Sequence, residues 1–201
     1  MEYLDILKRD IKTLRVDRNN LDSTILTNEN LNIFESLVLP ESKTIADIRR
    51  LYRFTDAIAE HPDEPYYVLL NARLEGFNKL IVLIKTDIGK TFGLYIPVRL
   101  FNDDSIRFNH NIYLFSIDLN EKFRLSDNVA IYDMSDTGIE FMDNNNAFGL
   151  FHPSNECIYV NRTKDVFNLN GIDPIDIFGP EMSKNIYKFT PIEVEVYQLT
   201  E

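Results

Sequence analysis

The apolar residues of the first segment recur at alternating spacings of three and four, which is typical of an amphipathic helix. The stripe consists of Leu4, Leu7, Ile11, Leu14, Leu21 and Ile25, and Arg18 occupies the one position that breaks it. We expect this helix either to lie on the main domain or to form a short coiled coil that makes a homodimer through residues 1–28. Pro40 and the polar residues 41–44 predict a linker. The chain therefore divides into an N-terminal helical segment, 1–40, and a main domain, 45–201.

Two stretches of the main domain also keep helical spacing. The first contains Ile45, Ile48, Leu51 and Tyr52, and the second repeats Tyr66, Leu69, Leu70, Leu74 and Phe77 on one face. Asp63 and Pro65 are start signals for the second helix, because Asp caps exposed N–H groups and Pro tolerates the first turn. Gly76 is suited to the left-handed residue that ends a helix. We predict a compact helix over 66–77.

The rest of the pattern predicts strands. Residues 80–85 form an apolar run, 87–89 have the chemistry of a hairpin turn, and 91–96 alternate with Phe92, Leu94 and Ile96 on one face. Further strands are expected at 112–117, 129–132, 138–142, 147–151, 157–161 and 192–199. In the last of these, the alternation puts Ile192, Val194 and Val196 on an apolar face and Glu193 and Glu195 on a solvent-facing one. The fold class is α+β and mostly β, a two-sheet antiparallel β-sandwich with flanking helices.

The charge of the 201 residues limits the class of partner. The net charge is −11, and because Met1 to Arg53 hold nine basic and nine acidic residues, the whole excess lies in the remainder. An acidic body repels nucleic acid and anionic lipid, whose binding depends on Lys and Arg. We therefore expect no direct nucleic-acid partner. The longest apolar runs are far shorter than a membrane-spanning helix, so no membrane insertion is expected.

The single cysteine, Cys157, excludes an internal disulfide and fits a reducing compartment. The first residues are acidic and lack the apolar stretch of a signal peptide. The expected location is cytoplasmic, with the nucleus as the alternative.

No motif in the sequence indicates catalysis. Gly89-Lys90-Thr91 resembles the end of a phosphate-binding loop, but Ile84 stands where its first glycine is required. The stretch 143–149 has the oxygen donors that open a calcium loop, but it lacks the loop's glycine and closing glutamate. His152 and Cys157 are close along the chain, which by itself shows neither a base nor an orienting group. We predict no catalytic residue, no metal site and no cofactor.

Four separated blocks of the main domain can be read together. They are 80–93 (LIVLIKTDIGKTFG), 113–117 (YLFSI), 146–151 (NAFGLF) and 189–197 (FTPIEVEVY). In order and spacing they resemble the hallmark strands of the TLDc domain, a family associated with oxidation resistance. The resemblance spans residues 45–201 and implies a two-sheet sandwich flanked by helices. One departure is Tyr197, which stands where the family's last strand usually holds Trp.

The resemblance implies a non-catalytic protein-interaction module linked to oxidative stress, with the peripheral subunits of the V-type ATPase as the leading partner. Family members that regulate this pump use a helix beyond the last strand, whereas this sequence ends at Glu201. The residues that match the motifs are Lys85, Phe92, Gly93, Phe115, Ser116, Phe148, Gly149, Glu193 and Glu195. The apolar residues and glycines are expected in core and turns. Lys85, Glu193 and Glu195 are the expected surface contacts. The alternatives are a coiled-coil adaptor and a redox enzyme that uses Cys157.

Overall fold

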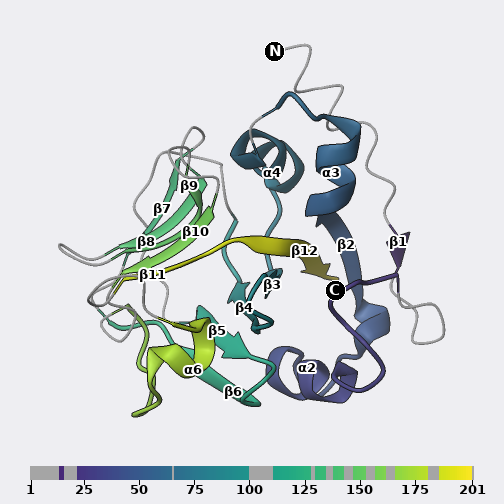
Figure 1. The fold of residues 1–201 in the computed structure, drawn as a ribbon. Helices are drawn as coiled ribbons and strands as arrows, with labels where there is room; N and C mark the ends of the chain where they lie inside the picture. Colours follow the sequence, from purple (N-terminus) through teal and green to yellow (C-terminus); the bar gives the residue numbers. More distant parts are fainter. Residues whose placement is uncertain are drawn as a thin grey trace.

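The structure, a computed structural model, consists mainly of antiparallel β-strands with a few short helices (Figure 1). It describes residues 14–15, 22–64, 66–99, 111–127, 130–134, 138–142, 147–152, 157–161, 166–180 and 186–200. For strands β7 to β10 the description is of the backbone. Within these residues no helix is long and apolar enough to cross a membrane.

Seven strands form the larger sheet, which we call the central sheet. Their spatial order is β1 (Leu14–Arg15), β2 (Ile48–Arg53), β12 (Pro191–Leu199), β3 (Leu80–Thr86), β4 (Thr91–Ile96), β5 (Tyr113–Ser116) and β6 (Glu121–Arg124). All neighbouring pairs are antiparallel. The last strand of the chain, β12, therefore lies between β2 and β3, near the middle of the sheet.

Five strands form the second sheet. Their order is β11 (Ile186–Phe189), β10 (Cys157–Asn161), β9 (Ala147–His152), β8 (Gly138–Met142) and β7 (Ala130–Met134), again with antiparallel pairing throughout. In Figure 1 this sheet lies to the left of the central sheet.

In the described parts of the chain, four α-helices and a 3-10 turn lie between the strands. They are α2 (Leu31–Val38), the turn η1 (Ile45–Asp47), α3 (Phe54–Glu60), α4 (Tyr66–Leu74) and α6 (Pro174–Phe178). Helix α6 starts with a cap that the sequence supplies locally, because the Asp173 carboxylate accepts a hydrogen bond from the N–H of Ile175 and Pro174 follows at the first position.

The middle of the central sheet is covered on both faces, so β3 and most of β12 are buried on both sides. On β3, Leu80, Val82 and Ile84 belong to a core cluster that includes side chains from α3, α4 and α6. Ile81 and Leu83 point to the opposite face, where they belong to a second cluster with α2 and residues 25–26. The fully apolar run in β3 is the sequence signature of this two-sided burial.

Most predicted strands are confirmed, and the helix predicted over 66–77 is confirmed over Tyr66–Leu74. The hairpin of β3 and β4 turns at Gly89, whose φ is +82°, and α4 is followed by Gly76, whose φ is +83°. Strands β5, β7, β8, β9, β10 and β12 lie at the predicted places. Pro65, the predicted start of α4, lies outside the described residues.

Two helix predictions differ from the structure. The helix predicted over 45–52 is wrong, because only Ile45–Asp47 form a short turn and Ile48–Arg53 form strand β2, which pairs with β12. In the N-terminal segment Leu14 and Arg15 form a short strand that pairs with β2, and residues 22–27 are not helical. The rest of that predicted helix lies outside the described residues. Helix α2, at 31–38, lies within the segment 1–40 that was predicted to be helical but beyond the apolar stripe of residues 4–25, and it packs on the central sheet.

Candidate functional site

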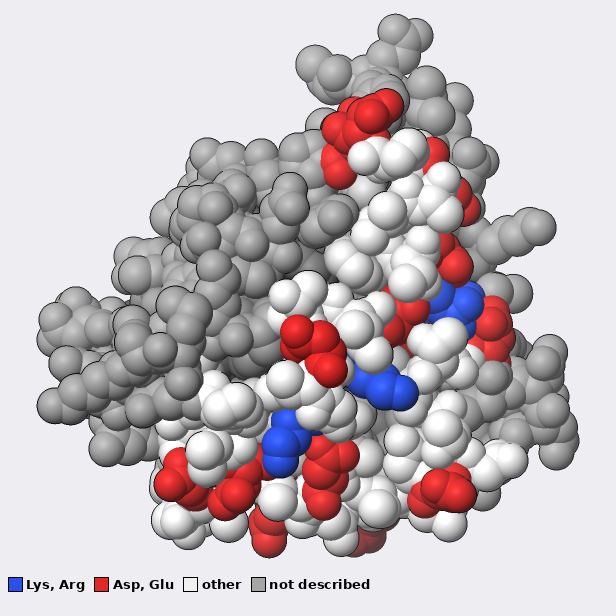
Figure 2. Space-filling view, in the orientation of Figure 1, with Lys and Arg blue, Asp and Glu red and all other residues white. Residues whose placement is uncertain are grey.

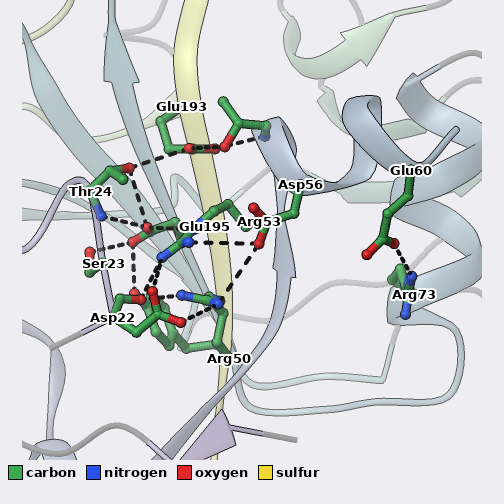
Figure 3. A network of polar contacts seen from close by, with 12 residues as sticks. Asp22, Ser23, Thr24, Arg50, Arg53, Asp56, Glu60, Arg73, Glu193 and Glu195 are labelled. Carbon is green, nitrogen blue, oxygen red and sulfur yellow. Dashed lines mark hydrogen bonds and ion pairs between the residues drawn. The ribbon is translucent and has the colours of Figure 1, made fainter. Parts of the chain in front are cut away.

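A cluster of charged side chains lies under the N-terminal segment, where residues 22–24 meet β12, β2 and the start of α3 (Figure 3). We call it the carboxylate network. Its centre is formed by Glu193 and Glu195, which are 4% and 0% exposed. Their predicted place on a solvent-facing side of the strand is therefore wrong. The alternation along the strand is present, but residues 22–26 and α2 cover the face on which the two glutamates lie. Ile192, which was expected on the apolar face, is 49% exposed.

Glu195 accepts hydrogen bonds from three neighbouring residues. The Ser23 hydroxyl donates to Oε2 at 2.5 Å and the Tyr197 hydroxyl donates to the same oxygen at 2.7 Å. The N–H of Thr24 donates to Oε1 at 2.9 Å. The Nε atom of Arg53 lies 3.4 Å from Oε1 and forms an ion pair with it. Arg53 is also the cross-strand partner of Glu195, so the β2–β12 register itself sets this pair.

Glu193 is held by the start of α3. The hydroxyl of Thr55 donates to Oε2 at 2.6 Å, and the N–H of Thr55 donates to Oε1 at 3.2 Å. The Thr24 hydroxyl also donates to Oε2, at 3.3 Å. Because N–H groups at the start of a helix carry partial positive charge, this position favours a carboxylate.

Two arginines and two aspartates complete the network. Arg50 donates to the Asp22 carboxylate at 2.8 Å and to the Asp22 carbonyl oxygen. Arg53 donates to the same two groups at 3.0 and 2.6 Å. Asp56 lies 3.6 Å from Arg53 and 3.9 Å from Arg50. Both guanidinium groups are mostly buried, so these bonds fix the N-terminal segment to β2.

The pKa shifts of Asp22, Arg53 and Tyr197 are those expected from these contacts. The hydrogen bond from Arg50 is the main cause that lowers the pKa of Asp22, with a further contribution from Arg53. Burial opposes the charged form of Arg53, but the hydrogen bond to Asp22 and the charge of Glu195 raise its pKa overall. Burial and the nearby Glu195 charge raise the pKa of Tyr197 well above its ordinary value. Tyr197 therefore stays protonated and remains a hydrogen-bond donor to Glu195.

The network uses its carboxylates to join parts of this chain. Each of Glu193 and Glu195 is engaged by donors from within the molecule, and the bonds connect segments more than 130 residues apart in the sequence. Among the described residues, no group of three or more His, Cys, Asp or Glu side chains could hold a metal ion. The chemistry present is charge neutralisation and the fixing of residues 22–24 on the sheet.

Gly93 and Phe115 are cross-strand partners on β4 and β5. A Cβ atom added to Gly93 would lie 2.2 Å from the Val82 carbonyl oxygen and 2.4 Å from the Phe115 ring. The missing side chain thus leaves room for the Phe115 ring, which meets Phe34 of α2 edge to face with centroids 6.3 Å apart. These two motif residues place α2 on the sheet.

The other motif residues of the central sheet have separate places. Phe92 is fully buried on the opposite face and packs edge to face against Phe178 of α6. Ser116 is buried, and its hydroxyl oxygen accepts a hydrogen bond from the N–H of Leu119. Lys85 is half-buried on β3, opposite Glu193 in the register.

Phe148 and Gly149 lie on β9 of the second sheet, and so are not brought together with the other motif residues in one sheet. Phe148 is the register partner of Val160 on β10. On the same pair of strands Cys157 is the register partner of His152. The stretch 143–149, whose oxygen donors resemble only the opening of a calcium loop, lies partly outside the described residues.

Sequence reasoning did not identify the residues that surround the two glutamates in the carboxylate network. These are Asp22, Ser23, Thr24, Arg50, Arg53, Thr55 and Asp56. The sequence feature that could have indicated them is the group of arginines at 49, 50 and 53 among the apolar residues 48, 51 and 52. Arginines are rarely buried unless they are paired with an acidic group.

No protein-family model matches this chain, and no curated protein sequence matches it.

Proposed function

We propose that this chain is a non-catalytic protein-interaction module of the TLDc type, linked to oxidative-stress resistance, with peripheral subunits of the V-type ATPase as its leading partner. The order of the strands supports this proposal. Three of the four blocks that resemble the family, 80–93, 113–117 and 189–197, become neighbouring strands β12, β3, β4 and β5. Blocks that are distant in sequence thus form one contiguous structural unit.

The two sheets are inferred to pack as the layers of a sandwich. Helix α4 contacts β2 of the central sheet and also β8 and β9 of the second sheet. Tyr187 of β11 belongs to the same core cluster as Val82 and Val194 of the central sheet. These shared contacts support a common core between the layers.

The observation that carries the non-catalytic part of the proposal is the engagement of Glu193 and Glu195. A general acid or base must reach a substrate proton within hydrogen-bond distance. Here the two buried carboxylates accept hydrogen bonds from Ser23, Thr24, Thr55 and Tyr197 of the same chain. Their role in this proposal is to stabilise the module.

The surface supports a basic protein partner. Exposed acidic residues of the described chain are Asp22, Glu29, Glu41, Asp56, Glu60, Asp63, Glu75, Asp87, Asp118, Glu121, Asp127, Asp173 and Asp176. Figure 2 shows carboxylates distributed across the described surface of one face. Complementary charge raises the rate of association and makes binding depend on salt.

Affinity capture with the full chain tests this function. We expect a specific protein partner, identified by mass spectrometry, to be recovered at low salt and reduced at high salt. A variant with Glu29, Glu41, Asp63 and Asp87 changed to their amides should recover less, whereas Lys90→Gln is the matched control. Recovery that is independent of salt and of these charges would contradict the electrostatic proposal.

The register of β9 and β10 favours a second candidate, a thiol-dependent redox function. In the backbone register of this antiparallel pair Cys157 is opposite His152, next to a shift in the pairing between Cys157 and Tyr159. An adjacent histidine can lower the pKa of a thiol and increase its reactivity. The pH dependence of the reaction of Cys157 with a disulfide reagent tests this, with His152→Asn as the comparison. Identical profiles, and peroxide survival that persists in Cys157→Ala, would remove this candidate.

A further inference from the structure

An open groove lies on the α2 face of the central sheet, beyond the end of α2. Its volume is about 790 Å³. Helix α2 and the segment before it cover this face over β2, β12, β3 and Phe115 of β5, whereas the groove lies over Tyr95 of β4, Tyr113 of β5 and the β6 strand. The groove is lined by Leu39, Pro40, Tyr95, Pro97, Asn111, Ile112, Tyr113, Lys122, Arg124, Asn168 and Asn170. We call it the β4–β6 groove.

The cross-strand register determines which side chains form the floor of the groove. Tyr95, Tyr113 and Arg124 are successive cross-strand partners on β4, β5 and β6, so their side chains lie on one face. The rings of Tyr95 and Tyr113 stack with centroids 5.1 Å apart. Lys122, two residues before Arg124, lies on the same face, with its Nζ 5.4 Å from the centre of the Tyr113 ring.

The floor is fixed before any ligand binds. The Tyr113 hydroxyl donates a hydrogen bond of 2.9 Å to the carbonyl oxygen of Val38, the last residue of α2. Burial raises the pKa of both Tyr95 and Tyr113 above the ordinary value of 10.0, so neither ring adds negative charge to the groove. Pre-organised groups lose little entropy when a ligand binds.

The charge of the groove is opposite to that of the molecule. The exposed cations among the described residues are Arg99, Lys122 and Arg124, and two of these three line the groove. Among the described residues that line it there is no carboxylate, and Glu121 lies on the other side of the β6 pleat. Within the described part of the chain, neither Lys122 nor Arg124 forms an ion pair with a carboxylate. At physiological salt, exposed charges more than about 8 Å apart are largely screened from one another. The electrostatic potential in the groove is therefore set mainly by the nearby Lys122 and Arg124.

We propose that the β4–β6 groove binds a small organic anion. Lys122 and Arg124 hold its phosphate or carboxylate group, and Tyr95, Leu39 and Pro97 contact an apolar or aromatic body. The volume lies within the usual range of about 300 to 1,000 Å³ for small-molecule sites, which combine apolar walls with a few fixed polar groups. This site goes beyond the protein-interaction function and does not depend on it.

Titration of the full chain with phenyl phosphate, followed by NMR of the backbone amides, tests the proposal. We expect saturable binding with a Kd of about 1 mM or tighter and shifts centred on the amides of Tyr95, Tyr113 and Arg124. Benzoate replaces the phosphate by a carboxylate and shows which anion the site prefers, and saturable binding of either supports the site. Inorganic phosphate and phenol each supply one half of the ligand and should bind at least about tenfold more weakly.

The variant Lys122→Gln/Arg124→Gln should weaken phenyl phosphate binding by about tenfold or more, because charge-assisted bonds to the anion are lost. Lys90→Gln, which removes a cation outside the groove, should bind like the unaltered chain. Lys122 and Arg124 are exposed, so replacing them should leave the fold intact. The positions of the amide shifts in the unaltered chain locate the binding site without any variant. Three results would each overturn the proposal: shifts that lie elsewhere, phenol binding as tightly as phenyl phosphate, or equal affinities of the two variants.

Discussion

At Gly93 a single missing side chain determines how α2 packs. The Val82 carbonyl oxygen would lie 2.2 Å from an added Cβ atom and belongs to the backbone of the neighbouring strand, so it cannot move aside as a flexible side chain could. The Phe115 ring fills the space instead and contacts Phe34. The family resemblance marked Gly93 and Phe115 as motif residues, and the structure supplies a physical reason for both.

We predict that Gly93→Ala lowers the free energy of unfolding by about 1 to 3 kcal/mol, the usual cost of overpacking a core. Urea unfolding of the variant measures this. Phe115→Leu provides the comparison, and in the double variant the two effects should not add, because removing the ring relieves one of the two clashes. An unchanged stability for Gly93→Ala would show that the sheet can separate there at little cost.

Tyr197 gives a second prediction at a single residue. Its hydroxyl donates to the fully buried Glu195 at 2.7 Å, and a raised pKa keeps the proton on the tyrosine. Tyr197→Phe preserves the ring and removes only this donor, so we expect a loss of about 1.5 to 3 kcal/mol, typical of a hydrogen bond to a charged group. Thermal and urea unfolding measure the loss. Tyr95→Phe, which removes a hydroxyl outside the network, should cost less, and equal losses would contradict the special role of Tyr197.

Among the elements, the network connects the N-terminal segment to β2 through Asp22. Arg50 and Arg53 lower the pKa of Asp22 below its ordinary value of 3.8, so its ionised form stabilises the folded state. This contribution is present above pH 3.8 and is lost as the pH falls through the lower pKa of the folded state. The Asp22 side chain is 51% exposed, and solvent screening keeps the contribution small.

We therefore predict that Asp22→Asn is less stable than the unaltered chain by about 1 kcal/mol at neutral pH, and that the difference shrinks toward zero in acid. Urea unfolding over a range of pH measures it. Asp63→Asn, at an exposed loop position, is the control and should show a smaller difference at neutral pH. A difference for Asp22→Asn that stays constant down to acid pH would exclude the ion pairs as its cause.

The elements that could be predicted from sequence are those specified by local signals. The hairpin of β3 and β4 has its turn residues at 87–89, and α4 has its apolar face and Gly76 within one short window. The apolar residues at 45, 48, 51 and 52 fit a helix locally, but pairing with β12, more than 130 residues away, makes 48–53 a strand. Long-range pairing overrides local pattern in this case.

The candidate site was only half predictable for the same reason. The alternation along β12 correctly put Glu193 and Glu195 together on one face of the strand. Whether that face is wet depends on residues 22–26, which cover it from the other end of the sequence. The β4–β6 groove likewise combines positions from β4, β5 and β6 with Asn168 and Asn170, and no single stretch of sequence contains its pattern.

At the scale of the whole molecule, residues 25–39 pack on the central sheet and cover part of one face. Ile81, Leu83 and Phe115 of the central sheet are 0% exposed beneath residues 25–39. At about 25 cal/mol per Å² of apolar surface, uncovering several such side chains costs several kcal/mol. A chain that starts at Lys43 would therefore expose a large apolar face and is a poor test of dimerisation.

We predict that a chain starting at Asp22 unfolds at nearly the same temperature as the full chain and is also monomeric, because it keeps the residues that cover the sheet. A chain starting at Lys43 should lose cooperative unfolding or self-associate through the uncovered face. Sedimentation velocity of the three chains, combined with thermal unfolding, measures both properties. If the full chain is dimeric and the chain starting at Asp22 is monomeric, the dimerising adaptor is the correct alternative. If the full chain and the chain starting at Asp22 both sediment as monomers, the first 21 residues do not dimerise the molecule. The N-terminal segment then acts through its packing on the sheet.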